Sequence, residues 1–155
     1  MRRVPFALLG ISLLVACGGG QPEDQTVEAA PDSVALALEQ FDTTVFDSIT
    51  WATDTAQINR GAVVWTFSCR KCHGEVGHGD AGFVIAGDTL VPPDFAQPGW
   101  RLATDRLELM KYIYAGNQQG MPHWGIQGLK PRDIDAVSAY IQELLVPVQP
   151  APPTS

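Results

Sequence analysis

The sequence has 155 residues, 45% of them hydrophobic, which is enough for one compact domain with appendages. Ten basic residues stand against seventeen acidic ones, and residues 18–56 hold eight of the acids but no Lys or Arg. Because no basic stripe is available to contact phosphates, this charge pattern argues against a nucleic-acid partner.

The first sixteen residues predict an export signal. The basic start MRR precedes an uncharged stretch, residues 4–16, that is too short to span the ~30 Å hydrocarbon core of a bilayer as a helix. Residues 14–17, LVAC, resemble the lipobox of bacterial lipoproteins. That resemblance implies an exported chain, anchored through a lipidated Cys17 to the extracytoplasmic side of a bacterial membrane. The alternative is an ordinary signal peptide in which Cys17 merely lies near the cleavage site.

Composition divides the chain into four parts. They are the signal peptide (1–16), the lipidated cysteine with a flexible acidic tether (17–53), an ordered domain (54–146) and a Pro-rich disordered tail (147–155). Within the tether, only a short helix from Val34 to Phe41 is expected.

Three helices are expected in the ordered domain. The first begins at Asp54, which forms a capping box with Gln57, and stops at Gly74. The second is capped by Thr104 and ends at Gly116. Its predicted buried residues are Leu107, Met110, Ile113 and Tyr114.

The third helix has Pro131 in its first turn and ends at Pro147. Its predicted buried face comprises Ile134, Val137, Tyr140, Ile141 and Leu144. The connections over 75–99 and 116–128 are rich in Gly and Pro and are predicted to be loops. Structureless loops of this length are uncommon in a compact domain, so we expect them to wrap around a large apolar body.

The stretch SCRKCHG, residues 68–74, contains the pattern C-x-x-C-H, which is the attachment signal for a c-type haem. Two thiols three residues apart can each add to one of two neighbouring vinyl groups, and the adjacent imidazole then faces the iron. A zinc site would need a second ligand pair, for which only His78 and His123 remain. A thioredoxin-like dithiol would need a βαβ pattern around it, and none is present.

Residues 55–146 resemble a class I cytochrome c of the small bacterial kind. The resemblance implies an all-α fold, with three main helices and long loops wrapped around one covalently bound haem c. Cys69 and Cys72 match the thioether cysteines and His73 matches the proximal iron ligand. Gly61 and Trp65 match the small and aromatic residues of the first helix, where the last helix, with its aromatic Tyr140, crosses closely.

The resemblance also implies Met121 as the second axial ligand, because it precedes Pro122 in a Gly-rich loop before the final helix. Three alternatives stay open. Met110 falls at core spacing, His123 would give a bis-histidine iron, and His78 would reach the iron only if its loop folded back.

Four further residues are candidates for contacts around the haem. In the family a loop proline carbonyl accepts the proximal histidine Nδ1–H, and either Pro92 or Pro93 could supply it. Trp100 and Arg101 are candidates for hydrogen bonds to the haem propionates, although both could equally be ordinary surface or core residues.

An iron with both axial positions filled transfers single electrons and has no vacancy for a small-molecule substrate. The leading hypothesis is therefore an electron carrier, not an enzyme, that passes electrons between redox protein partners at a membrane surface. The second is the cytochrome c subunit of a membrane-associated dehydrogenase or terminal reductase complex. A haem enzyme or gas sensor would require Met121 to be absent or displaceable.

Overall fold

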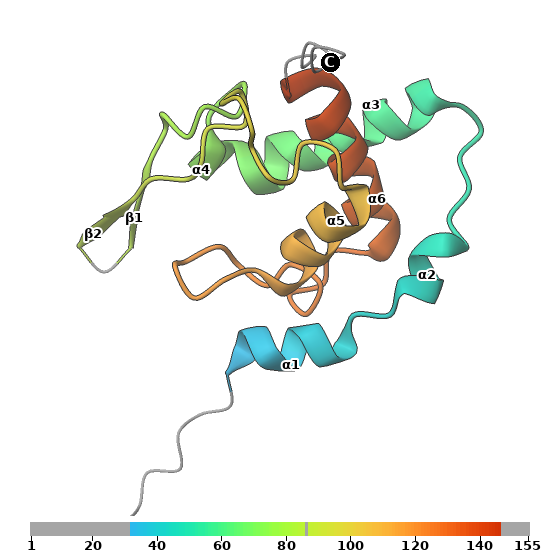
Figure 1. The fold of residues 1–155 in the computed structure, drawn as a ribbon, viewed down its shortest axis with the longest axis horizontal. Helices are drawn as coiled ribbons and strands as arrows, with labels where there is room; N and C mark the ends of the chain where they lie inside the picture. Colours follow the sequence, from blue (N-terminus) through green and yellow to red (C-terminus); the bar gives the residue numbers. More distant parts are fainter. Residues whose placement is uncertain (1–31, 86, 147–155) are drawn as a thin grey trace, which may run out of the picture. The chain divides into compact units, whose positions relative to one another are not determined.

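The computed structural model describes residues 32–85 and 87–146, and the arrangement of their helices is shown in Figure 1. The predicted signal peptide, Cys17 and the tail from residue 147 lie outside these residues. In chain order the elements are α1 (Ser33–Gln40), α2 (Thr43–Asp47), α3 (Asp54–Val64), η1 (Trp65–Cys69), α4 (Arg70–His73), β1 (Phe83–Ile85), β2 (Asp88–Leu90), α5 (Arg106–Ala115), α6 (Pro131–Tyr140) and η2 (Ile141–Leu145).

The first predicted helix is a succession of α3, η1 and α4. Its N-cap is Thr53, whose side chain accepts a hydrogen bond from Ala56 N, and not the predicted Asp54, which occupies the first helical position. The helix ends at Gly74 as predicted, with a φ of 80° that a residue with a side chain adopts only with strain. The segment η1 is π-helical, so Trp65 and Cys69 both turn inward while Phe67 between them is exposed.

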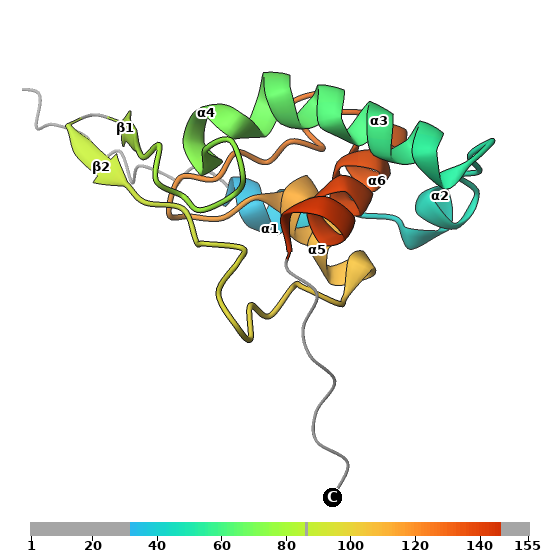
Figure 2. The same ribbon diagram turned by 90° about the horizontal axis from the view of Figure 1, so that it is seen from above.

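α3 and α6 make the most extensive contact between any two described elements, and they cross as Figures 1 and 2 show. Gly61 lies at the crossing. A Cβ at this position would overlap the Ala136 carbonyl and lie 2.6 Å from Tyr140 Cβ. The close approach expected from Gly61 is therefore confirmed, and Trp65 packs beside Tyr140 with ring centroids 6.1 Å apart.

The helix α5 begins one residue later than predicted, with Asp105 rather than Thr104 as its N-cap. Its buried stripe is centred on Leu109 and Ile113, one turn apart. The prediction that Leu107 is buried is wrong. Residues two apart on a helix point about 200° away from each other, so Leu107 lies away from Leu109 and is 43% exposed.

The last helix has Pro131 at its first position, as predicted, and buries Ile134 and Val137 completely. Its predicted inward residue Leu144 is instead 60% exposed, and Leu145 is buried. The reason is the π-helical turn η2. A π-helical turn contains more residues than an α-helical one, so the residue that shares the buried face with Ile141 is Leu145, four residues later, and not Leu144.

A two-stranded antiparallel hairpin, β1–β2, lies within the segment predicted to be a loop throughout. Phe83 pairs with Leu90 and Ile85 with Asp88. The hairpin projects from the helices in Figure 1 and is the only sheet among the described residues. The structure is otherwise helical, which is compatible with the all-α fold expected.

Order begins earlier than position 54. Residues 32–53, which were expected to belong to a flexible tether, include α1 and α2, and Ala37 and Phe46 are buried. Phe41 contacts both Phe46 and Tyr114, with ring centroids 5.0 and 5.4 Å away. The apolar side chains of this segment thus find a surface on the domain, an outcome that composition alone did not indicate. No helix in the described part of the chain is long and apolar enough to cross a bilayer.

Candidate haem site

A cavity of about 600 Å³ lies between the C-x-x-C-H segment and the loop that precedes α6. Cofactor sites typically have volumes of ~300–1,000 Å³ and mostly apolar walls. The residues that the sequence favoured for the site all contribute to its lining: Cys69, Cys72, His73, Pro92, Pro93, Trp100, Arg101 and Met121. Residues up to 52 positions apart in the chain are thus brought to one space.

The two cysteines lie on η1 and α4 and are not joined by a disulfide. Burial, and secondarily the neighbouring Cys72, raises the pKa of Cys69 to about 12, and burial also raises the pKa of Cys72. A redox-active dithiol needs a thiolate of lowered pKa, so this environment does not favour the thioredoxin-like alternative.

His73 lies between two aromatic rings. The centroid of Phe95 is 5.1 Å from that of the imidazole, and the centroid of Trp65 is 5.9 Å away. Burial lowers the pKa of His73 to about 4. The ring is therefore neutral at physiological pH, the state in which a nitrogen lone pair can bind a metal ion.

The Nδ1 atom of His73 is buried and has no hydrogen-bond partner. The hydrogen bond expected from Nδ1 to a carbonyl of Pro92 or Pro93 is therefore not formed here, and which proline supports His73 stays a prediction. Pro92 is nevertheless close to the histidine segment. Gly79 N donates to His73 O over 3.0 Å, and a Cβ at Gly79 would overlap the Pro92 carbonyl.

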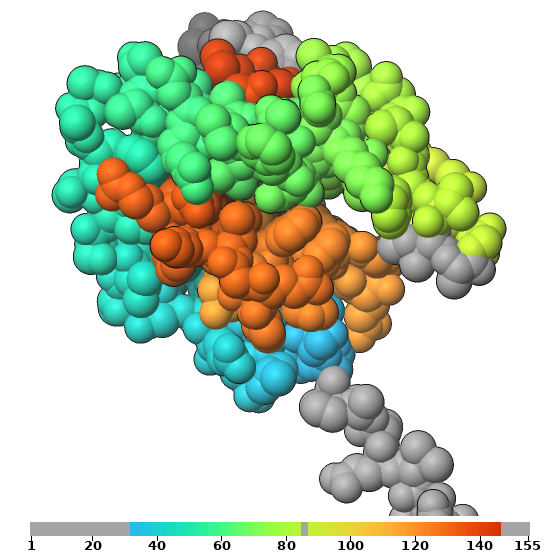
Figure 3. All heavy atoms as spheres, turned by 180° about the vertical axis from the view of Figure 1, so that it is seen from behind, coloured from blue at the N-terminus to red at the C-terminus, as the bar shows by residue number. Residues whose placement is uncertain are grey.

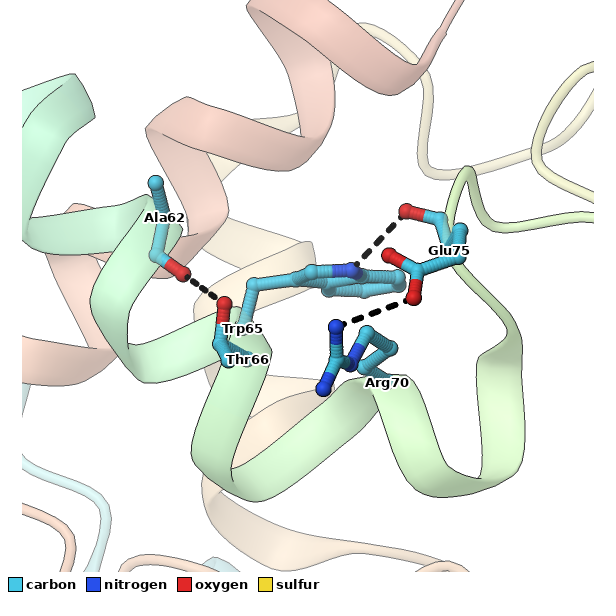
Figure 4. Close-up of polar contacts among 5 residues, drawn as sticks. All are labelled: Ala62, Trp65, Thr66, Arg70 and Glu75. Carbon is cyan, nitrogen blue, oxygen red and sulfur yellow. Dashed lines mark hydrogen bonds and ion pairs between the residues drawn. The ribbon is translucent and has the colours of Figure 1, made fainter.

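The turn that follows His73 is held by polar contacts to residues of η1 and α4, as Figure 4 shows. The Trp65 indole Nε1 donates to Glu75 O over 3.2 Å, and the Arg70 guanidinium contacts the Glu75 carboxylate at 2.9 Å. These contacts join Glu75, which follows α4, to Trp65 in η1 and to Arg70 in α4. They fix the direction in which the chain leaves the haem-attachment motif.

Residues 92–102 form a further part of the wall, next to His73. Phe95 stacks on Trp100 with centroids 4.5 Å apart, so Trp100 supports the ring that contacts His73. The neighbouring Asp94 is paired with His78 at 2.9 Å, and this hydrogen bond lowers the pKa of Asp94. Phe95 was missed by sequence reasoning, because a lone Phe in a Pro-rich loop carries no periodic signal.

The β1–β2 hairpin also borders the cavity, through Phe83 and Leu90. The Lys71 ammonium lies 4.6 Å from the Phe83 ring centroid. Across the cavity, a Cβ at Gly120 would overlap the Leu90 side chain. The hairpin therefore contacts both the attachment motif and the loop that carries Met121.

Met121 lines the cavity, whereas the three alternative iron ligands do not. Met110 is 7% exposed and packed in the hydrophobic core, in agreement with its helical spacing. His78 is paired with Asp94, and Nε2 of the His123 ring lies 3.5 Å from the side-chain amide nitrogen of Gln127. Of these four candidates only Met121 contributes to the space that His73 borders.

The described residues offer no set of ligands for the alternative zinc site. Among the described residues, no three His, Cys, Asp or Glu side chains come together in a group that could hold a metal ion. The residues that line the cavity instead suit a haem. Its walls are mainly apolar, two free thiols lie on adjacent turns, and a neutral imidazole and a thioether border the same space.

The helical fold and the C-x-x-C-H motif that lines its cavity define a class I c-type cytochrome domain, which acts as an electron carrier. The chain belongs to the family "Cytochrome C oxidase, cbb3-type, subunit III", which it matches over residues 56–141. Membership implies a covalently bound haem c. It also explains why the long loops enclose a cavity rather than pack on one another.

Two curated relatives have similar sequences. The chain is 29% identical over 91 residues to the cbb3-type cytochrome c oxidase subunit FixP of Azorhizobium caulinodans, which covers 59% of this chain and 28% of that protein. It is 27% identical over 94 residues to the corresponding subunit CcoP of an Azospirillum species, covering 60% and 30% respectively. The match thus spans less than a third of the length of either relative. No solved structure is significantly similar to the chain.

Proposed function

We propose that residues 54–146 bind one haem c and pass single electrons within a membrane-associated terminal oxidase complex. Thioethers from Cys69 and Cys72 would attach the haem, and His73 and Met121 would ligate its iron. The observation that carries the proposal is that all four side chains line one cavity. The match to an oxidase-subunit family favours a complex over a freely diffusing carrier. The single C-x-x-C-H motif in the sequence supports the proposal of one haem.

The iron of such a haem exchanges one electron between its ferrous and ferric states. The protein contributes the surroundings. Phe95 and Trp65 hold the His73 ring, and burial keeps that ring neutral. The mainly apolar lining disfavours the additional positive charge of the ferric state, and the soft sulfur of Met121 favours ferrous iron, so both raise the reduction potential.

Purification from detergent-solubilised membranes tests this proposal. If the chain is an oxidase subunit, it will co-purify in constant ratio with the oxygen-reducing subunit of a terminal oxidase, and dioxygen will oxidise its reduced haem within that complex. Recovery of the haem protein alone, at every detergent strength that keeps the oxidase intact, would support the freely diffusing carrier instead.

The second candidate is a lipid-anchored electron carrier outside any complex, which the LVAC sequence at residues 14–17 favours. We infer that Cys17 is lipidated and holds the protein to the extracytoplasmic face of a membrane. Two or more acyl chains, at ~0.8 kcal/mol per buried methylene, would give stable anchoring.

Replacing this cysteine, Cys17→Ala, is expected to move the holoprotein from the membrane fraction to the soluble fraction, with its haem spectrum unchanged. Fractionation followed by haem staining measures both properties. Membrane retention of this variant in cells that lack the oxidase would contradict the lipid anchor.

A further inference from the structure

Asn117 lies at the start of the loop that joins α5 to Met121, and sequence analysis assigned it no role. We propose that Asn117 is a positioning residue for Met121. Its side chain fixes the loop backbone so that the thioether is held at the cavity. This inference rests on the proposed ligation of iron by Met121.

Asn117 holds the main chain of Met121 on both sides. Its Oδ1 accepts a hydrogen bond from Met121 N over 3.1 Å, and its own backbone N donates to Met121 O, also over 3.1 Å. The same Oδ1 accepts from Gln119 N over 2.9 Å, closing a turn of the Asx type. The side chain and the backbone N–H of Asn117 together hold the three residues that lead to the ligand.

The other end of the carboxamide is tied to a helix. Asn117 Nδ2 donates to the Tyr112 hydroxyl over 2.6 Å. Tyr112 belongs to α5 and is half-buried, and the Arg101 guanidinium lies 5.2 Å from its ring centroid. Asn117, Tyr112 and Met121 all line the cavity, so the loop is anchored to a rigid element at the edge of the site itself.

The backbone of this loop needs such an anchor. Gly116 and Gly120 have φ values of 67° and 112°, which glycine adopts without strain but which leave the free chain many alternative conformations. A thioether is a weak ligand. It stays bound to iron only if the loop is already ordered, because ligation then costs little further conformational entropy. A loop without the Asn117 contacts would release Met121 more often.

The same loop offers a matched control. Gln118, the next residue, is exposed, and its amide donates to the Asp32 carboxylate over 2.8 Å, on the segment that precedes α1. Figure 3 shows the atoms of α1 against those of the segment after α5. Gln118→Ala removes one hydrogen bond of this loop but none of those made to the Met121 backbone.

The test uses the ferric holoprotein and titrates it with imidazole, which competes with a methionine for ferric iron. Asn117→Ala is expected to bind imidazole about tenfold more tightly than the wild type, the effect of losing side-chain hydrogen bonds to the loop amides worth about 1.4 kcal/mol. Its sulfur-to-iron charge-transfer band should weaken in parallel. Gln118→Ala should match the wild type in both measurements.

A conservative variant separates positioning from general loop stability. Asn117→Asp keeps the Oδ1 acceptor for the Gln119 and Met121 amides but removes the donor to Tyr112, so it should retain most of the charge-transfer band. If Asn117→Ala does not fold, Asn117→Asp and Tyr112→Phe are titrated with imidazole instead. The imidazole affinity of each should lie between that of the wild type and that of Met121→Ala.

The possible failures are distinguishable. If the wild type shows the band and the Asn117 variants bind imidazole as Gln118→Ala does, the positioning role is wrong while the ligation of iron by Met121 stands. If Met121→Ala has the spectrum and imidazole affinity of the wild type, Met121 is not the ligand, and both the proposed ligation and the role of Asn117 are overturned.

Discussion

Replacing both Cys69 and Cys72 by alanine is expected to abolish covalent attachment of haem to the chain. The two thiols are free and border the same cavity as His73, and no other cysteine belongs to the domain. Denatured wild-type holoprotein should keep its red pigment through extraction with acidified organic solvent, whereas the double variant should lose all of it. Cys69→Ala alone should keep the pigment through one remaining thioether.

The double variant should also lose its tertiary structure. Without an attached haem, the mainly apolar walls of this space of about 600 Å³ would be exposed to water, which forfeits burial worth ~25 cal/mol per Å² of apolar surface. Domains of this size have a free energy of unfolding of only ~5–15 kcal/mol. Near-ultraviolet circular dichroism and hydrogen exchange measure this loss, and Cys17→Ala is the control for removal of a cysteine outside the domain. Pigment extracted completely from the wild type would contradict covalent attachment.

Replacing Met121 by alanine is expected to open one axial position of the iron and to lower its reduction potential. The expected fall is on the order of 0.2 V, a fraction of the ~0.8 V range over which axial ligands set haem potentials. The physical reason is the loss of a soft, neutral donor that favours ferrous iron. A redox titration measures the potential, and rapid binding of carbon monoxide by the reduced variant reports the open position.

Met110→Leu is the matched control. Met110 is a buried core residue on α5 that does not line the cavity, so its replacement by a side chain of similar volume should change neither potential nor spectrum. Rapid carbon monoxide binding by the wild type itself would instead favour the haem enzyme or gas sensor. A potential lowered by Met110→Leu and not by Met121→Ala would reverse the assignment of the ligand.

The sequence by itself determined the chemistry of the site. The C-x-x-C-H spacing is local, because the two thiols and the imidazole lie on adjacent turns whatever the rest of the chain does, and the motif therefore identified the cofactor. Helical periodicity likewise predicted Met110 as a core residue, and the preference of proline for the first helical turn predicted Pro131 at the start of α6. The crossing at Gly61 was implied by the resemblance to class I cytochromes c. The first two features depend on a local pattern of residues fewer than about ten positions apart.

Only the tertiary structure decided which distant residues share the cavity with that motif. The π-helical turn η2 buried Leu145 in place of Leu144. On α5, packing centred on Leu109 and Ile113 left Leu107 facing outward. Phe95, Tyr112 and Asn117 became neighbours of the proposed ligands through contacts that no local pattern encodes. Residues 32–53 pack on the domain instead of remaining a tether, because the apolar groups of Ala37, Phe41 and Phe46 reach a surface that helices distant in the sequence provide.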